Sequence, residues 1–190
     1  MPATVPEQPA TMTTTTAVQQ RIGTKPTLIS VPPLQFLIMD APLQGNLHVY
    51  IKEMRKHHVT DVVRVCEPTY REKGELQNAG MCLHEMEYKD GTSPSKDLIS
   101  RWLELVEKRF ITGDPAGSAI AVHCVAGLGR APVMVAIALI EFANMDPVEA
   151  VSLIRNKRRG AINEKQLLYL EGYKKQYKKT TAEGVCCVIS

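Results

Sequence analysis

The residues best suited to chemistry lie together in one short stretch, His123-Cys124-Val125-Ala126-Gly127-Leu128-Gly129-Arg130. It separates the apolar run 119–122, typical of a strand covered on both faces, from residues 130–143, which predict a buried helix. Two glycines allow the intervening loop to curl with its N–H groups inward, and the helix adds the positive end of its dipole. The stretch therefore predicts a cradle for a phosphate dianion, lined by residues 125–130.

Cys124 lies at the mouth of this cradle and is the predicted nucleophile. A cysteine at a helix N-terminus can fall in pKa from about 8.5 to about 3.5–7.5, and a thiolate that faces a bound phosphate is placed for in-line attack. Arg130 can hold two phosphate oxygens with its planar fork. His123 is expected to brace the loop by hydrogen bonds rather than act as a base. The alternative is a packed Cys beside a His, but the coincidence of these residue types at one strand-to-helix turn favours an active site.

Phosphoryl transfer to a thiolate also needs an acid that protonates the leaving oxygen. Asp90 is the candidate, because it lies in a loop beside Gly91 that can move over the cradle; Glu87 is the rival. The alternative for Asp90 is an ordinary turn residue before glycine. No second pair of ligands stands at metal spacing, so no metal or cofactor is expected.

Strand and helix patterns alternate along the chain and predict an α/β sandwich with a central, mainly parallel sheet flanked by helices. Residues 1–33 hold eight Thr and six Pro but only three charged residues, which predicts a disordered arm. The catalytic domain is expected at 34–179 and a tail at 180–190. Strands are expected at 34–39, 59–65, 81–86 and 119–122, and helices at 46–57, 95–110, 130–143, from 146 and at 163–179.

The net charge of +3 is unevenly distributed. Residues 155–179 hold nine Lys or Arg against two Glu, a local charge of +7, so the rest of the chain carries −4. A basic region of this kind indicates an anionic surface or partner, and the alternative is a solvated helix face. Nucleic acid is not expected, since no aromatic stacking platform or recognition helix accompanies the charge. No apolar run approaches the ~18 residues of a membrane span.

The last four residues, Cys187-Val188-Ile189-Ser190, match a prenylation box, and the final Ser favours farnesyl on Cys187. The basic region upstream would supply the second signal that a single lipid chain needs to hold a membrane. The alternative is a frayed apolar tail, and acylation of Cys186 stays open. We expect the cytoplasmic face of plasma and endosomal membranes, with a cytoplasmic pool.

The His-Cys-x5-Arg pattern resembles the signature of the cysteine-dependent protein tyrosine and dual-specificity phosphatases. Residues 124–132, 157–161, 165–170 and Val63-Arg64-Val65-Cys66-Glu67 resemble the phosphatases of regenerating liver more closely, over about residues 34–190. The resemblance implies a protein tyrosine phosphatase-like fold, with Cys124 as nucleophile, Arg130 as phosphate binder and Asp90 as general acid. It also implies that Cys66 forms a reversible disulfide with Cys124.

The chain departs from these relatives at the acid loop, where Met86-Glu87 replace the usual Trp-Pro and Lys89 replaces a second acid. Ala131 matches the regenerating-liver phosphatases and lacks the hydroxyl that helps hydrolyse the phosphocysteine, which implies slow turnover. The resemblance implies a second activity, binding to the CBS-pair module of CNNM-type magnesium transport mediators, and permits self-association. Phosphotyrosine, phosphothreonine and phosphoinositide substrates all stay open.

Overall fold

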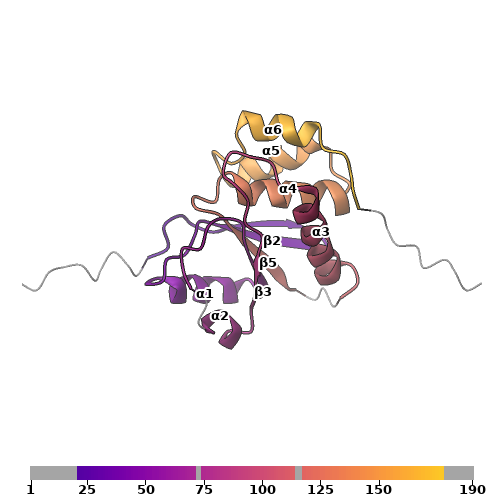
Figure 1. Ribbon diagram of the computed structural model, residues 1–190. Helices are drawn as coiled ribbons and strands as arrows, with labels where there is room; N and C mark the ends of the chain where they lie inside the picture. The colour runs from indigo at the N-terminus through magenta and orange to yellow at the C-terminus, as the bar shows by residue number, and fades with distance from the viewer. Residues whose placement is uncertain (1–20, 72–73, 114–116, 178–190) are drawn as a thin grey trace, which may run out of the picture.

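The computed structural model describes residues 21–71, 74–113 and 117–177. A five-stranded sheet in the order β1-β2-β5-β3-β4 lies between two groups of helices (Figure 1). The helices α1 (Leu47–Lys56) and α2 (Glu75–Asn78) cover one face; α3 (Lys96–Phe110), α4 (Arg130–Phe142), α5 (Pro147–Lys157) and α6 (Glu164–Glu171) cover the other. The strands are β1 (Thr27–Val31), β2 (Leu34–Met39), β3 (Val59–Arg64), β4 (Cys82–Glu85) and β5 (Ala119–His123).

The sheet is mainly parallel, as predicted: β2, β5, β3 and β4 run in the same direction, and only β1 is antiparallel to its neighbour. Parallel strands end at the same edge of a sheet, so the segments that follow them meet there. In the pairing of β3 with β5, Arg64 lies opposite His123. The register therefore brings Cys66, two residues beyond β3, close to Cys124, one residue beyond β5.

The core forms because β5 and α4 are apolar on all sides and are covered by the remaining elements. Every residue of β5 is buried, and so is nearly all of α4. The apolar stripe of α3 packs on the same face, where the Phe36 ring lies 5.6 Å from Trp102 and 5.5 Å from Phe110. Trp102 donates its indole N–H to Met134 O at 2.8 Å, which fixes α3 against α4.

The predicted boundary of the N-terminal arm is wrong, because β1 lies inside it and pairs with β2 from Thr27↔Ile38 to Val31↔Leu34. The Pro- and Thr-rich composition of residues 1–33 obscured the short pattern Leu28-Ile29-Ser30-Val31, of which Ile29 is buried. The folded domain thus extends to residue 21 at least. Residues 1–20 of the predicted arm lie outside the described residues.

The last helix ends at Glu171, not near 179 as the basic pattern suggested. After Gly172 the chain runs back over α3 and α4, where Glu141 accepts hydrogen bonds from Tyr173 Oη at 2.6 Å and from Gln176 N at 2.7 Å. Tyr177 Oη donates to Glu107 at 2.7 Å. These hydrogen bonds hold the segment after Gly172 in a non-helical conformation.

The short helix α2 lies between two predicted strands, in a stretch for which no helix was predicted.

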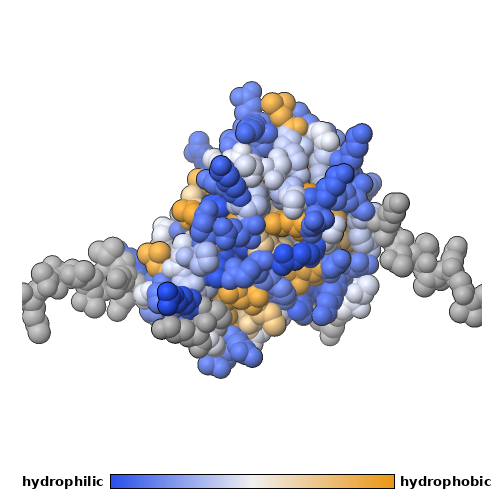
Figure 2. All heavy atoms as spheres, viewed as in Figure 1, coloured by the Kyte–Doolittle hydropathy of each residue, from blue (hydrophilic) through white to orange (hydrophobic). Residues whose placement is uncertain are grey.

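Hydrophilic side chains cover most of the face shown in Figure 2, and apolar side chains form separate patches between them. Within the described ranges, no helix has both the length and the apolar character that crossing a bilayer requires.

Candidate active site

Residues 124–130, here called the cradle loop, turn four successive carbonyl groups away from their centre. The carbonyl oxygens of residues 125 to 128 accept hydrogen bonds, in order, from Ala41 N at 3.1 Å, Arg158 Nη2 at 3.4 Å, Arg158 Nε at 2.6 Å and Ile162 N at 2.8 Å. In a trans peptide the following N–H points the opposite way. The amides of residues 126–129 therefore face into the loop, and among the described residues they have no acceptor. This is the anion nest that the sequence predicts.

Glycine is required at position 127. Its φ is +67°, and a Cβ there would lie 2.4 Å from Met39 O and 2.5 Å from Arg158 Nη2. Any side chain would push the loop off the body of the domain and disorder the inward amides. The loop then leads directly into α4, whose N-terminus adds its partial positive charge to the cradle.

Cys124 is buried at the base of the cradle, 3 % exposed, directly after β5. Arg130 is 2 % exposed and begins α4. Its Nη1 donates to Tyr88 O at 3.0 Å and lies 3.3 Å from a carboxylate oxygen of Glu67. Its Nε is buried and makes no hydrogen bond to the described residues, so this donor is available to an oxyanion that enters the cradle.

Residues 87–94, here called the acid loop, place Asp90 beside the Arg130 guanidinium. Asp90 Oδ1 lies 3.4 Å from Arg130 Nε, and the Asp90 side chain is 75 % exposed. Glu87, the rival acid, is exposed, and within the described ranges no hydrogen bond or ion pair joins it to Arg130. The geometry thus distinguishes between two carboxylates that the sequence left in competition.

Contacts on both sides of Asp90 hold the acid loop in place, one to the cradle loop and one to α6. Tyr88 Oη donates to Arg130 O at 3.0 Å while Arg130 Nη1 donates to Tyr88 O, a reciprocal pair. Lys165 Nζ donates to Gly91 O at 3.2 Å from the start of α6. Burial, reinforced by Cys124, raises the pKa of Tyr88, which therefore stays a neutral hydrogen-bond donor.

His123 is fully buried, and burial lowers its pKa to about 3. Its imidazole is therefore neutral and only weakly basic, which fits a bracing role better than that of a base. Its Nε2 lies 3.0 Å from Tyr70 Oη. The predicted brace thus runs to the segment after Cys66 and not to the cradle loop itself.

Cys66 is buried in the same core cluster as Cys124. Burial raises its pKa to about 11, with the Arg130 charge acting in the opposite direction and Cys124 in the same one. The influence of Cys124 on Cys66 agrees with the strand register, which brings the two residues close together. Both are free thiols here.

Arg158 was not identified from the sequence as part of the site, since it was counted in a basic region expected to face an anionic surface or partner. It is 4 % exposed and donates to Gly127 O, Ala126 O, Lys25 O at 3.1 Å and Thr27 Oγ1 at 3.0 Å. It ties the cradle loop to the segment that enters β1. The signal in the sequence was its place before Gly160-Ala161, a stretch shared with the relatives named above.

Glu67 was also missed as a member of the site, although it follows Cys66 in a motif already noted. Its own backbone N–H and then Arg130 lower the pKa of this exposed carboxyl, so it is ionised beside the guanidinium.

Within the described ranges no group of three His, Cys, Asp or Glu side chains is arranged to hold a metal ion.

The fold and the cradle define a cysteine-dependent phosphatase, and residues 44–176 match the family model of the dual specificity phosphatase catalytic domain. The chain is 44 % identical to the PRL-1 phosphatase of Drosophila melanogaster over 156 residues, 82 % of this chain and 86 % of that protein. It is 43 % identical to protein tyrosine phosphatase type IVA 3 of Homo sapiens over 169 residues, 86 % and 95 % of the two chains.

A solved protein tyrosine phosphatase structure from Leishmania major superposes with a TM-score of 0.72 at 40 % identity, covering 80 % of this chain and all of the other. The chain belongs to the type IVA protein tyrosine phosphatases, the PRL family, within the dual-specificity phosphatases. The sequence resemblance is confirmed, and the protein is a protein tyrosine phosphatase.

Proposed function

We propose that this protein hydrolyses phosphomonoesters of protein substrates through a phosphocysteine on Cys124. The observation that carries the proposal is the cradle loop: four carbonyls turned outward, the amides inward, and Arg130 and Cys124 at its two ends. These groups match a phosphate dianion in charge and in hydrogen-bond donors. Phosphotyrosine and phosphothreonine proteins are the proposed substrates, with phosphoinositides as the other class that the same cradle would accept.

The two chemical steps follow from this arrangement. The Cys124 thiolate attacks phosphorus while the P–O bond to the substrate breaks, and Asp90 gives its proton to the leaving oxygen. Water then attacks the phosphocysteine, the P–S bond breaks, Asp90 takes up a proton, and Cys124 and phosphate are released. Arg130 and the inward amides hold the phosphoryl oxygens through both transition states.

The second step is proposed to be slow, because Ala131 is buried next to the cradle and has no hydroxyl. We expect the phosphocysteine to accumulate when the protein meets an excess of aryl phosphate, and intact-protein mass spectrometry after rapid acid quenching would detect it on Cys124. The Ala131→Ser variant should hydrolyse the aryl phosphate about tenfold faster and accumulate less phosphocysteine. A failure to find phosphate on Cys124 in either protein would refute this mechanism.

Cys66 is proposed to protect and switch off the nucleophile. Peroxide oxidises the Cys124 sulfur to a sulfenic acid and is itself reduced; the Cys66 sulfur then attacks the Cys124 sulfur, and water leaves. The fully buried position of Cys66 beside Cys124 and Arg130 supports this pairing.

The elevated pKa of Cys66 makes the bridge pH-dependent. Because a pKa of about 11 leaves Cys66 mostly protonated near neutrality, the resolving step should accelerate about tenfold per pH unit from pH ~7 to ~9. Mass mapping of the 66–124 bridge after peroxide treatment measures this. Cys66→Ser should abolish the bridge and Cys82→Ser should leave it intact. A rate independent of pH would contradict the assignment.

Membrane attachment is proposed through farnesyl on Cys187, which lies outside the described residues, together with basic side chains near the C-terminus. Cys187→Ser should move the protein from the membrane to the soluble fraction in cell fractionation, since a basic patch alone gives only about 1 kcal/mol per residue against anionic lipid. Cys186→Ser is the matched control. Retention of the Cys187→Ser protein on plasma and endosomal membranes would contradict a lipid at this position.

A second candidate function is favoured by Ala131: a slow enzyme whose cradle docks a CNNM-type transport mediator, with phosphocysteine formation regulating the docking. Cys124→Asp and Asp90→Ala should both lose catalysis. If only Cys124→Asp loses the cellular phenotype, docking is the main role. If both lose it equally, catalysis is.

A further inference from the structure

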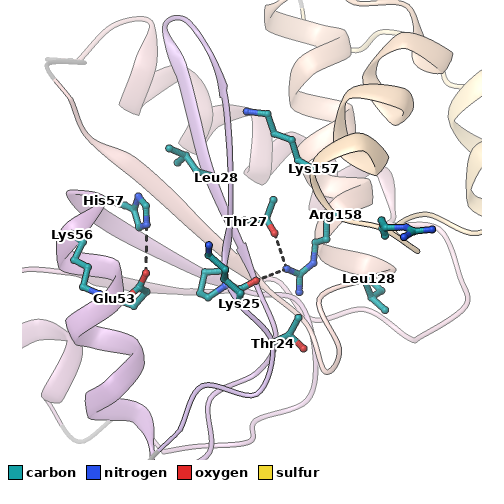
Figure 3. Close-up of a pocket in the computed structure, with 12 residues that line it drawn as sticks. Thr24, Lys25, Thr27, Leu28, Glu53, Lys56, His57, Leu128, Lys157 and Arg158 are labelled. Carbon is teal, nitrogen blue, oxygen red and sulfur yellow. Dashed lines mark hydrogen bonds and ion pairs between the residues drawn. The ribbon is translucent and has the colours of Figure 1, made fainter.

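A groove of about 690 Å³ lies beside the cradle loop and the start of β1. Its walls come from β1 and the segment before it, the C-terminal end of α1, and the end of α5 (Figure 3). The groove reaches the sheet at the first two residues of the edge strand β1, Thr27 and Leu28. Leu128, 36 % exposed, belongs both to the cradle loop and to this groove.

The groove is strongly cationic. Five basic side chains line it against one carboxylate, Glu53. Glu53 is already neutralised by Lys56 at 2.5 Å, with His57 at 3.8 Å. The basic residues are Lys25, Lys56, Lys157, Arg158 and Arg159.

Most of this positive charge is not compensated within the domain. Among the described residues Lys25, Lys157 and Arg159 form no ion pair. Arg158 is buried, and its acceptors are neutral oxygens of Gly127, Lys25 and Thr27. In Figure 3 Lys157 reaches over the groove from α5, while Lys25 comes from the strand side. Anionic groups placed between them would be attracted from both walls.

The shape of the groove selects the kind of anion. Its volume of about 690 Å³ is large for a single phosphate group, and its lining includes Thr27 and Leu28 of β1, an edge strand whose outer side no described strand pairs. An extended chain lies naturally along such an edge. The ends of this chain do not supply the charge, because residues 1–20 contain one acidic residue and residues 178–190 contain one.

We propose that the groove binds an acidic, extended segment of a protein substrate next to its phosphorylated residue. The segment would leave the cradle at Leu128 and continue along β1, with Asp or Glu side chains between Lys25 and Lys157. The inference rests on the proposed function, since it assumes a phosphopeptide in the cradle. Acidic residues next to the phosphorylated residue would then help to select the substrate, through side chains that do not touch the phosphate itself.

Binding to the full-length Cys124→Ser protein tests the groove separately from turnover. Two phosphotyrosine peptides are compared, one with three Glu beside the phosphotyrosine and one with Gln in their place. The acidic peptide should bind about tenfold more tightly at low ionic strength, with the difference shrinking toward unity at about 1 M salt. Fluorescence anisotropy gives both dissociation constants.

The Lys25→Gln/Lys157→Gln substitution should reduce the preference to about twofold or less. The matched control Lys52→Gln/Lys108→Gln removes two exposed charges elsewhere and should keep it. Equal affinity for the two peptides, or a preference that survives in the groove variant, would overturn the proposal. Two further results would also overturn it. One is that vesicles bearing phosphoinositide displace the peptide and no longer bind to the Lys25→Gln/Lys157→Gln variant. The other is that the preference for the acidic peptide appears only after deletion of residues 1–20. Turnover of an aryl phosphate by the unaltered protein tests the proposed function, and its outcome does not depend on what the groove binds.

Discussion

Replacing Cys124 with serine should reduce aryl phosphatase turnover at least about 10⁴-fold, to the background of the assay. A serine hydroxyl would occupy the same place at the base of the cradle, but it is almost never ionised near neutral pH. His123, the neighbouring imidazole, is turned toward Tyr70. Steady-state hydrolysis of an aryl phosphate is the measurement.

The same variant should keep its fold and its affinity for phosphate. Cys124 is a small buried side chain, so its replacement by serine leaves the packing of β5 and α4 nearly unchanged. Thermal unfolding and binding of inorganic vanadate or phosphate check this. Cys82→Ser, at an exposed thiol on β4, is the matched control and should retain full activity. Undiminished turnover in Cys124→Ser would remove Cys124 from the reaction.

Arg130→Lys is expected to lower kcat/KM about 10²- to 10³-fold. Lysine keeps the positive charge, but it cannot present two parallel donors to a phosphoryl group. It also loses the Nη1 contact with Tyr88 O and the pairing with Glu67, so the acid loop that carries Asp90 is held less firmly. Both kcat and KM should therefore change, whereas removal of a positive charge far from the cradle should leave kcat unchanged.

Arg101→Lys is the matched control, since Arg101 is exposed and its guanidinium donates to a carbonyl, Glu85 O, at 3.0 Å, away from Arg130. Its kcat/KM should match that of the unaltered protein. If Arg130→Lys lost less than about threefold, the guanidinium would not be the principal phosphate ligand. The carbonyl-out geometry of the cradle loop would then be the remaining support for phosphate binding.

Arg158 shows how far the site extends beyond the residues that touch phosphate. One buried guanidinium accounts for two of the four hydrogen bonds that turn the cradle carbonyls outward, and it joins the loop to residues 25 and 27. The N-terminal segment, which composition assigned to a disordered arm, thereby becomes part of the support of the active site. Charge counting could not separate Arg158 from its exposed neighbours Lys157 and Arg159, because burial is not encoded in composition.

The local features of this protein follow from its sequence. The cradle loop needs only a buried strand, two glycines and a helix start within ten residues, and each is visible as a short pattern. The alternation of strands and helices and the starts of α3 and α5 are equally visible in short patterns, and the structure confirms them, with Ser95 and Asp146 as the N-caps of the two helices.

The pairing of distant segments was decided only by tertiary packing. Glu67 and Asp90 reach Arg130 across 63 and 40 residues of chain, and Arg158 reaches Lys25 across 133. No short pattern records such contacts, because each depends on the register of the sheet and on which helices cover it. The sequence by itself thus determined the cradle loop and the side chains within it, because these lie next to one another in the chain. The tertiary structure decided that Asp90 and not Glu87 lies beside Arg130, that Cys66 shares a core cluster with Cys124, and that Arg158 is buried against the cradle loop.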